Sequence, residues 1–130
     1  MLLDTSGLFC LHYRDEPRHD SARTQFRAAR RRLTHSYVLA EFVALVEARG
    51  LPRGPGLSFL RDLIFNPRIQ VVWVAEALNQ AGVDLLEARL DKSYSLCDAV
   101  SFVLMRQRNI HAALTTDHHF DQEGFQRLLR

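Results

Sequence analysis

The sequence has few cysteines, a single lysine and no long apolar run, and each shortage excludes a class of protein. Cys10 and Cys97 both stand within apolar helical patterns, so we interpret them as small buried residues and not as a disulfide framework. No run approaches the roughly 20 apolar residues that a membrane-spanning helix needs. Asp4 interrupts the N-terminus before a signal-peptide core could form. We therefore expect a cytoplasmic protein without a membrane segment.

The charge of the chain is nearly balanced, with 17 basic and 15 acidic residues. This balance does not by itself indicate nucleic-acid binding. The kind of basic residue is more informative, because only Lys92 is lysine and the arginine side chain suits bidentate contacts with phosphate. A general compositional bias towards arginine explains the same observation, and we favour that explanation.

Strand-like and helical patterns alternate along the 130 residues, which we expect to form one domain spanning residues 1–130. We expect strands at residues 1–3, 33–35, 69–74, 110–115 and 125–129, and helices at residues 5–14, 19–32, 37–49, 57–65, 75–90 and 95–108. The alternation predicts an α/β fold with a mainly parallel central sheet and helices on both faces.

Local patterns add detail to this fold. Residues 69–74 are nearly continuous in apolar residues, as buried parallel strands are, and we expect Trp73 in the core. The prolines and glycines at residues 52–56 predict a loop before the next helix. Ser36 is the expected N-cap of the helix at residues 37–49.

Four acidic residues stand where a site would form in such a sheet. Asp4 and Asp117 each follow a predicted strand, and Glu41 and Asp98 each lie near the start of a predicted helix. Open parallel sheets bind ligands outside the carboxyl ends of their strands, so all four can converge on one rim. Each acid also has an ordinary role: Asp4 and Asp117 fit helix or turn caps, Asp98 fits a capping box with Ser95, and Glu41 fits an exposed helix face.

Carboxylates packed closely repel one another unless a cation lies among them. Oxygen ligands favour a hard ion, so we expect Mg²⁺ or Mn²⁺. Such an ion activates water as a nucleophile and stabilises charge on a phosphodiester. His118 and His119 have no matching Cys or His pair for a closed zinc site. We interpret them as surface residues, and contact of one of them with substrate phosphate is the less favoured alternative.

The same residues resemble the PIN-domain family over essentially the whole chain. The likeness is carried in order by Leu-Asp-Thr-Ser at residues 3–6, Glu41, Ser-Leu-Cys-Asp-Ala-Val at 95–100, and Thr-Thr-Asp-His-His-Phe at 115–120 with Gly-Phe at 124–125. The resemblance implies a three-layer α/β/α sandwich and a metal-dependent endoribonuclease with Asp4, Glu41, Asp98 and Asp117 as catalytic and metal-binding acids. The size is similar to VapC-like toxins of prokaryotic toxin–antitoxin pairs, which implies an RNA substrate, a homodimer and a small antitoxin partner.

Neighbouring positions support this resemblance or depart from it. Thr5 and Ser6 match the hydroxyl residues that follow the first Asp in the family and could orient that acid or a water, although turn capping explains them equally well. Ser95 has the same two explanations, with capping favoured. The family often has a further acid two residues after the fourth one, where this chain has His119. Asp121 is a candidate substitute at a greater distance.

Other functions fit parts of the pattern. An aspartyl-nucleophile phosphatase also has an Asp after its first strand, but it usually needs a second Asp where this chain has Ser6, and a lysine near the phosphate, for which only Lys92 is available. A response-regulator receiver needs a lysine after a late strand. A non-catalytic PIN-fold domain that binds a partner is the remaining alternative, and the four acids argue against it.

The segment from Phe42 to Phe65 carries more apolar residues than one small sheet obviously needs. We expect about half of them in the core and the rest in a groove for an amphipathic partner helix or in a dimer face. These residues are Leu45, Val46, Leu51, Leu57, Phe59, Leu60, Leu63, Ile64 and Phe65.

Overall fold

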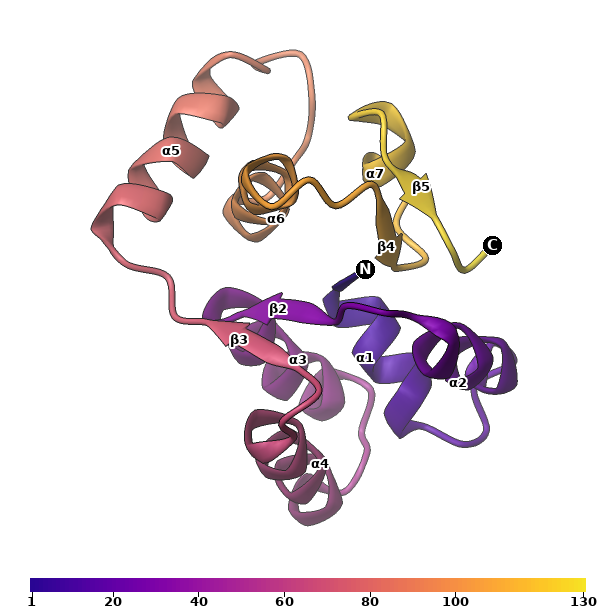
Figure 1. Cartoon of the computed structure of the whole chain (residues 1–130). Helices are drawn as coiled ribbons and strands as arrows, with labels where there is room; N and C mark the ends of the chain where they lie inside the picture. Colours follow the sequence, from indigo (N-terminus) through magenta and orange to yellow (C-terminus); the bar gives the residue numbers. More distant parts are fainter.

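The computed structural model describes residues 1–130, which form a five-stranded sheet between two layers of helices (Figure 1). The strands are β1 (Leu2–Leu3), β2 (Leu33–His35), β3 (Gln70–Val72), β4 (Ala112–Leu114) and β5 (Gln126–Arg127). The helices are α1 (Thr5–His12), α2 (His19–Ala28), α3 (Ser36–Ala48), α4 (Arg53–Phe65), α5 (Glu76–Glu87), α6 (Leu96–Gln107) and α7 (His119–Gln122). The strand order is β3-β2-β1-β4-β5 and every neighbouring pair is parallel. The predicted α/β/α sandwich with a parallel sheet is confirmed.

The central strand β1 is buried on both faces because successive strand residues point to opposite sides. Leu3 packs into a cluster with Leu8 of α1 and Phe42 of α3. Leu2 packs into a second cluster with Phe102 and Met105 of α6. Helices α1 to α4 therefore cover one face of the sheet, and α5 and α6 cover the other (Figure 1). No helix in the protein is both long enough and apolar enough to cross a bilayer.

Helix α1 lies unusually close to β4, and Gly7 makes this possible. A Cβ atom at Gly7 would lie 1.9 Å from the carbonyl oxygen of Leu114, so any other residue would force the helix away from the strand. The backbone N–H of Asp4 donates to the same carbonyl at 3.2 Å. These contacts hold the first turn of α1 against the end of β4, directly before Thr115.

The expected placement of Trp73 in the core is wrong. The strand there is shorter than predicted and lies at the edge of the sheet, paired only with β2. Trp73 follows its last residue and is 63% exposed, because no further strand flanks this edge. Ile69, just before the strand, is the residue of this segment that is buried in the core.

Two helix starts also differ from the prediction. The expected loop at residues 52–56 is wrong, because α4 begins at Arg53. Pro55 fits its first turn since those backbone N–H groups have no intrahelical partner to lose. His35, and not Ser36, is the N-cap of α3. Ser36 instead accepts a hydrogen bond from the backbone N–H of Val74 at 2.9 Å, which ties α3 to the end of β3.

Candidate functional site

The four acids come from four different elements near one rim of the sheet. Asp4 directly follows β1, Asp117 lies three residues beyond β4, Asp98 is in the first turn of α6 and Glu41 is in α3. Asp4 and Asp98 are buried, with 5% and 8% exposure, whereas Glu41 is exposed. Thr115 connects Asp4 to Asp117, since its Oγ1 donates to Asp4 Oδ2 and accepts from the backbone N–H of Asp117. His119 connects Asp117 to Asp98, since its Nδ1 lies 3.1 and 3.5 Å from their carboxylates.

Hydroxyl groups hold Asp4 against the segment that follows β4. Thr115 Oγ1 donates to Asp4 Oδ2 at 2.7 Å, and Ser6 Oγ lies 3.5 Å from the same oxygen. The backbone N–H groups of Asp117 and Thr116 donate to Thr115 Oγ1 and Ser6 Oγ at 3.0 and 2.9 Å. Ser6 thus lies where it can orient Asp4, which is one of the two roles considered for it from the sequence. Thr115 has the larger role, and the sequence analysis missed it.

The surroundings of Asp4 and Asp98 disfavour a negative charge on either one. Burial raises the pKa of Asp4 to about 7, the hydrogen bond from Thr115 opposes that shift, and the charges of Asp98 and Asp117 add to it. Burial also raises the pKa of Asp98, with a further contribution from Asp117, while the backbone N–H of Ser95 opposes the rise. A bound cation would remove this electrostatic cost.

Asp98 forms a capping box and lies in the acid cluster at the same time. The backbone N–H of Ser95 donates to Asp98 Oδ2, and the backbone N–H of Asp98 donates to Ser95 Oγ, both at 3.0 Å. His119 Nδ1 lies 3.5 Å from the same Oδ2 atom. The structural and chemical roles of Asp98 are therefore compatible.

Glu41 lies at the flank of the cluster. Thr5 Oγ1 donates to Glu41 Oε2 at 3.1 Å, which connects the first turn of α1 to α3. Cys97 lies within reach of both Glu41 and Asp4: burial raises the pKa of its thiol first, and these two carboxylates raise it further. Thr5 therefore positions Glu41, and does not contact Asp4 through its side chain.

The interpretation of His119 as a surface residue is wrong. Its side chain is 17% exposed, and its Nδ1 atom lies 3.1 Å from Asp117 Oδ1, because the unpredicted helix α7 turns the ring inward. His118 does lie at the surface, with its side chain 65% exposed. Asp117, His118 and His119 each offer a ligand atom, and these three atoms lie within 4.8 Å of one another. The four acids alone form no group that compact.

Asp121 lies apart from this group. Its carboxylate oxygens lie 2.9 Å from Arg127 Nε and 3.5 Å from an Arg130 guanidinium nitrogen. These two arginines occupy the carboxylate, so we leave Asp121 out of the site.

An ion-pair network centred on the buried Glu123 supports His119 through Tyr94. Glu123, whose side chain is 3% exposed, lies 3.0 Å from Arg89 Nε and 2.6 Å from Arg106 Nη2, and it accepts a hydrogen bond from Tyr94 at 3.2 Å. Burial alone would raise the pKa of Glu123, but the two arginines outweigh it and the net pKa is lowered. The Tyr94 ring in turn packs edge-on against His119 at 5.4 Å.

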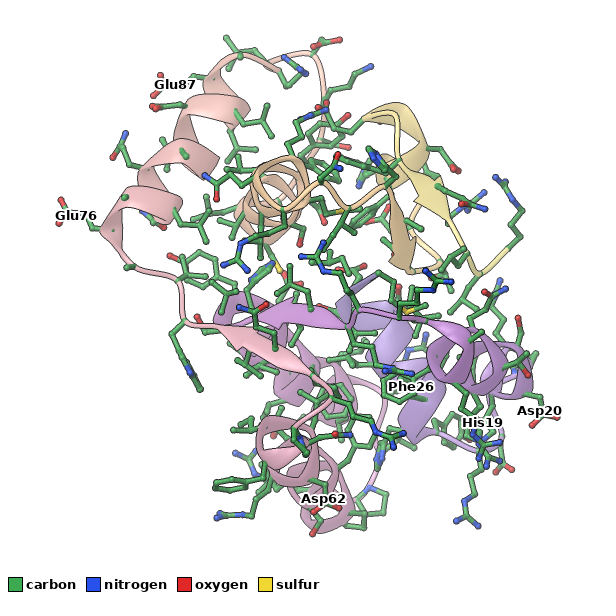
Figure 2. The ribbon with its side chains drawn as sticks, viewed as in Figure 1. His19, Asp20, Phe26, Asp62, Glu76 and Glu87 are labelled. Carbon is green, nitrogen blue, oxygen red and sulfur yellow. The ribbon has the colours of Figure 1, made fainter.

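The largest groove on the protein, about 800 Å³, lies away from the acids, between α1, α2 and α4. Figure 2 shows His19 and Phe26 on α2 and Asp62 on α4, which are three of its lining residues. Its walls combine apolar Leu11, Phe26, Phe59 and Leu63 with basic Arg14, Arg23 and Arg27. The apolar segment expected to form a partner groove thus contributes Phe59 and Leu63, whereas Val46 is buried in the core and Leu57 and Phe65 are exposed.

Comparisons with known proteins agree with this architecture. The family model described as PIN domain matches residues 1–125. The crystal structure of VapC20 from Mycobacterium tuberculosis, a toxin that cleaves the sarcin-ricin loop, superposes with a TM-score of 0.89 at 23% sequence identity, covering 99% of this chain and 98% of that one. No curated protein matches the sequence. The family model covers nearly the whole chain and includes all four acids, so the chain belongs to the PIN domain family.

Proposed function

We propose that the protein is a divalent-metal-dependent endoribonuclease of the VapC-like toxin kind, with residues 1–130 as one catalytic domain. The observation that carries this proposal is the meeting of Asp4, Asp98 and Asp117 at one rim of a PIN fold, two of them buried. A structural relative cleaves the sarcin-ricin loop, which directs the proposal to RNA as the substrate class.

The donor set fits Mg²⁺ or Mn²⁺, since carboxylate oxygens dominate it and the buried acids are costly to ionise without a cation. Asp4, Asp98, Asp117 and Glu41 would hold the ion. When bound, it supplies a Lewis acid that activates water and neutralises charge on the phosphodiester. Ser6 and Thr115 keep Asp4 in place, and Ser95 does the same for Asp98. Thr5 donates to Glu41 Oε2 and so holds this carboxylate at the flank of the cluster.

Purified protein should cleave RNA in Mg²⁺ or Mn²⁺ and should leave 5′-phosphate and 3′-hydroxyl ends. We expect these ends because the site offers carboxylates that would hold a metal ion for water activation. End-labelled RNA and mass spectrometry of the products are the measurement. Full cleavage in excess EDTA, or products with 2′,3′-cyclic phosphate, would contradict the mechanism. Inactivity with either metal would favour the non-catalytic partner-binding alternative.

The proposal includes a small antitoxin partner that binds the groove between α1, α2 and α4. The groove is lined by apolar side chains and by three arginines, which suits an amphipathic helix with acidic residues. The proposal also includes a homodimer and a cytoplasmic location. Exposed large apolar side chains, namely Phe65, Trp73 and Leu90, offer contact area for a second copy of the chain.

Reversing two charges in the groove, Arg23→Glu with Arg27→Glu, should weaken binding of the antitoxin about 100-fold, because like charges would then face each other. Both arginines are exposed on α2, so the fold should tolerate the change. Isothermal titration with the antitoxin gives the affinity. Arg61→Glu is the matched control, since Arg61 is exposed on α4 and does not line the groove. Equal affinities for the wild type and the double variant would place the partner elsewhere.

A further inference from the structure

We propose that His119 is a nitrogen ligand of the metal, and that it makes the site favour Mn²⁺ over Mg²⁺. The inference rests on the proposed function only in placing a divalent ion among the acids. Its starting observation is that Asp98 and Asp117 form no ion pair with lysine or arginine. The nitrogen-bearing side chains within ion-pair distance of these two carboxylates are histidines.

The His119 ring presents one nitrogen to both carboxylates. Nδ1 lies 3.1 Å from Asp117 Oδ1 and 3.5 Å from Asp98 Oδ2. An ion shared by the two carboxylates would therefore lie within reach of this nitrogen. Together with Asp4, these residues form a mixed set of carboxylate oxygen donors and one imidazole donor.

The opposite side of the ring is fixed by contacts that suit a ligand. Nε2 lies 3.2 Å from Ser93 Oγ, which can accept a hydrogen bond from a protonated Nε2. In that tautomer the Nδ1 lone pair faces the carboxylates. The Tyr94 ring packs against His119, and Glu123 holds Tyr94 in turn. The backbone N–H of His119 donates to Asp117 Oδ1 at 2.9 Å, which fixes the start of α7. Metal-ligating histidines generally have their second ring nitrogen hydrogen-bonded, as Nε2 is here to Ser93.

His118 is the rival ligand, and the geometry favours His119. The His118 side chain is 65% exposed, and its Nδ1 atom lies 3.7 Å from Asp117 Oδ1. No Asp98 contact is found for it, whereas His119 contacts both acids. One imidazole among carboxylates disfavours Mg²⁺, which prefers oxygen ligands and retained waters, and suits a transition metal such as Mn²⁺.

Pulsed electron paramagnetic resonance of Mn²⁺ bound to the full chain tests the inference directly, because a coordinated imidazole gives a ¹⁴N coupling. We expect this coupling in the wild type and its loss in His119→Asp. The same variant should bind Mg²⁺ in competition with Mn²⁺ about tenfold better than the wild type does, since an oxygen ligand replaces a nitrogen one. His119→Asn serves as a second variant if His119→Asp does not fold, as judged by circular dichroism.

His118→Asn is the matched control and should keep the ¹⁴N coupling. Absence of Mn²⁺ binding, absence of the coupling in the wild type, its survival in His119→Asp, or its loss only in His118→Asn would each overturn the inference. The measurement needs no RNA. A ¹⁴N coupling in a protein that cuts no RNA would support this inference and contradict the proposed function. An active ribonuclease without the coupling would support the proposed function and contradict this inference.

Discussion

Asp98→Asn should reduce RNA cleavage at least about 100-fold while the fold stays intact. The substitution removes one negative charge from the group that would hold the metal. The asparagine side-chain oxygen can still accept the hydrogen bond from the backbone N–H of Ser95, so the capping box of α6 is not lost outright. Cleavage rates of the purified variant, measured beside the wild type at saturating metal, give the result.

Thermal melts of the same variant separate its two roles. In EDTA, Asp98→Asn should be as stable as the wild type or more so, because burial and Asp117 disfavour the charge that it removes. Mn²⁺ at about a hundred times its dissociation constant should stabilise the wild type by roughly 2.7 kcal/mol, and Asp98→Asn by far less.

Ser95→Ala is the matched control for the capping box. It should lower the free energy of unfolding by about 1 kcal/mol and should keep the stabilisation by Mn²⁺. If Asp98→Asn instead melts clearly lower in EDTA while the wild type ignores Mn²⁺, Asp98 is only a cap and the proposed site is wrong.

Asp4→Asn should remove a pH dependence of stability in metal-free protein. Burial raises the pKa of Asp4 in the folded protein to about 7, above the ordinary aspartate value of 3.8 expected for the unfolded chain. The folded protein therefore binds more protons between these values, and Asp4 makes stability fall as pH rises from about 4 to 7. The size of the effect is on the order of 4 kcal/mol across that window. Urea unfolding in EDTA at several pH values measures it.

The pH dependence must be taken as the difference between wild type and Asp4→Asn, because His35 also makes stability depend on pH. Burial lowers the pKa of His35 to about 4, so this residue makes stability fall in the opposite direction, as pH drops below the ordinary histidine value of 6.5. His35 is present in both proteins, so its contribution cancels in the difference between wild type and Asp4→Asn. A difference that does not change between pH 4 and 7 would mean that neither burial nor the neighbouring acids raise the pKa of Asp4.

Several parts of the fold were predictable from sequence because they depend on local pattern. Leu2 and Leu3 predict a buried strand, and the alternation with amphipathic helices predicts the parallel sheet. Trp73 was misplaced because an apolar run does not show how many neighbours its strand will have. The start of α4 was misplaced because proline and glycine are typical of loops, yet Pro55 fits the first turn of a helix.

The candidate site also contains residues that the sequence indicated and residues that it did not. Asp4, Asp98 and Asp117 were found because each stands at the end of a strand or the start of a helix, a position that sequence reveals. Thr115 and His119 were not identified as site residues, because their roles depend on contacts that only the folded chain makes. Thr115 reaches Asp4 across 111 positions of sequence, and His119 is turned inward by a four-residue helix that no clear pattern predicted.

The position of β1 in the middle of the sheet has a consequence for protein synthesis. Of the five strands this one is made first, yet it pairs with β4, which is made fourth. Domains fold during translation from the N-terminus onwards, and contacts between distant positions form late. The acids from residues 4 and 117 therefore cannot meet on the ribosome until almost the whole chain has emerged. The groove uses residues 11–69 alone, so its surface is synthesised before the acid site is complete, and a partner that binds there has time to engage the chain before the acids meet.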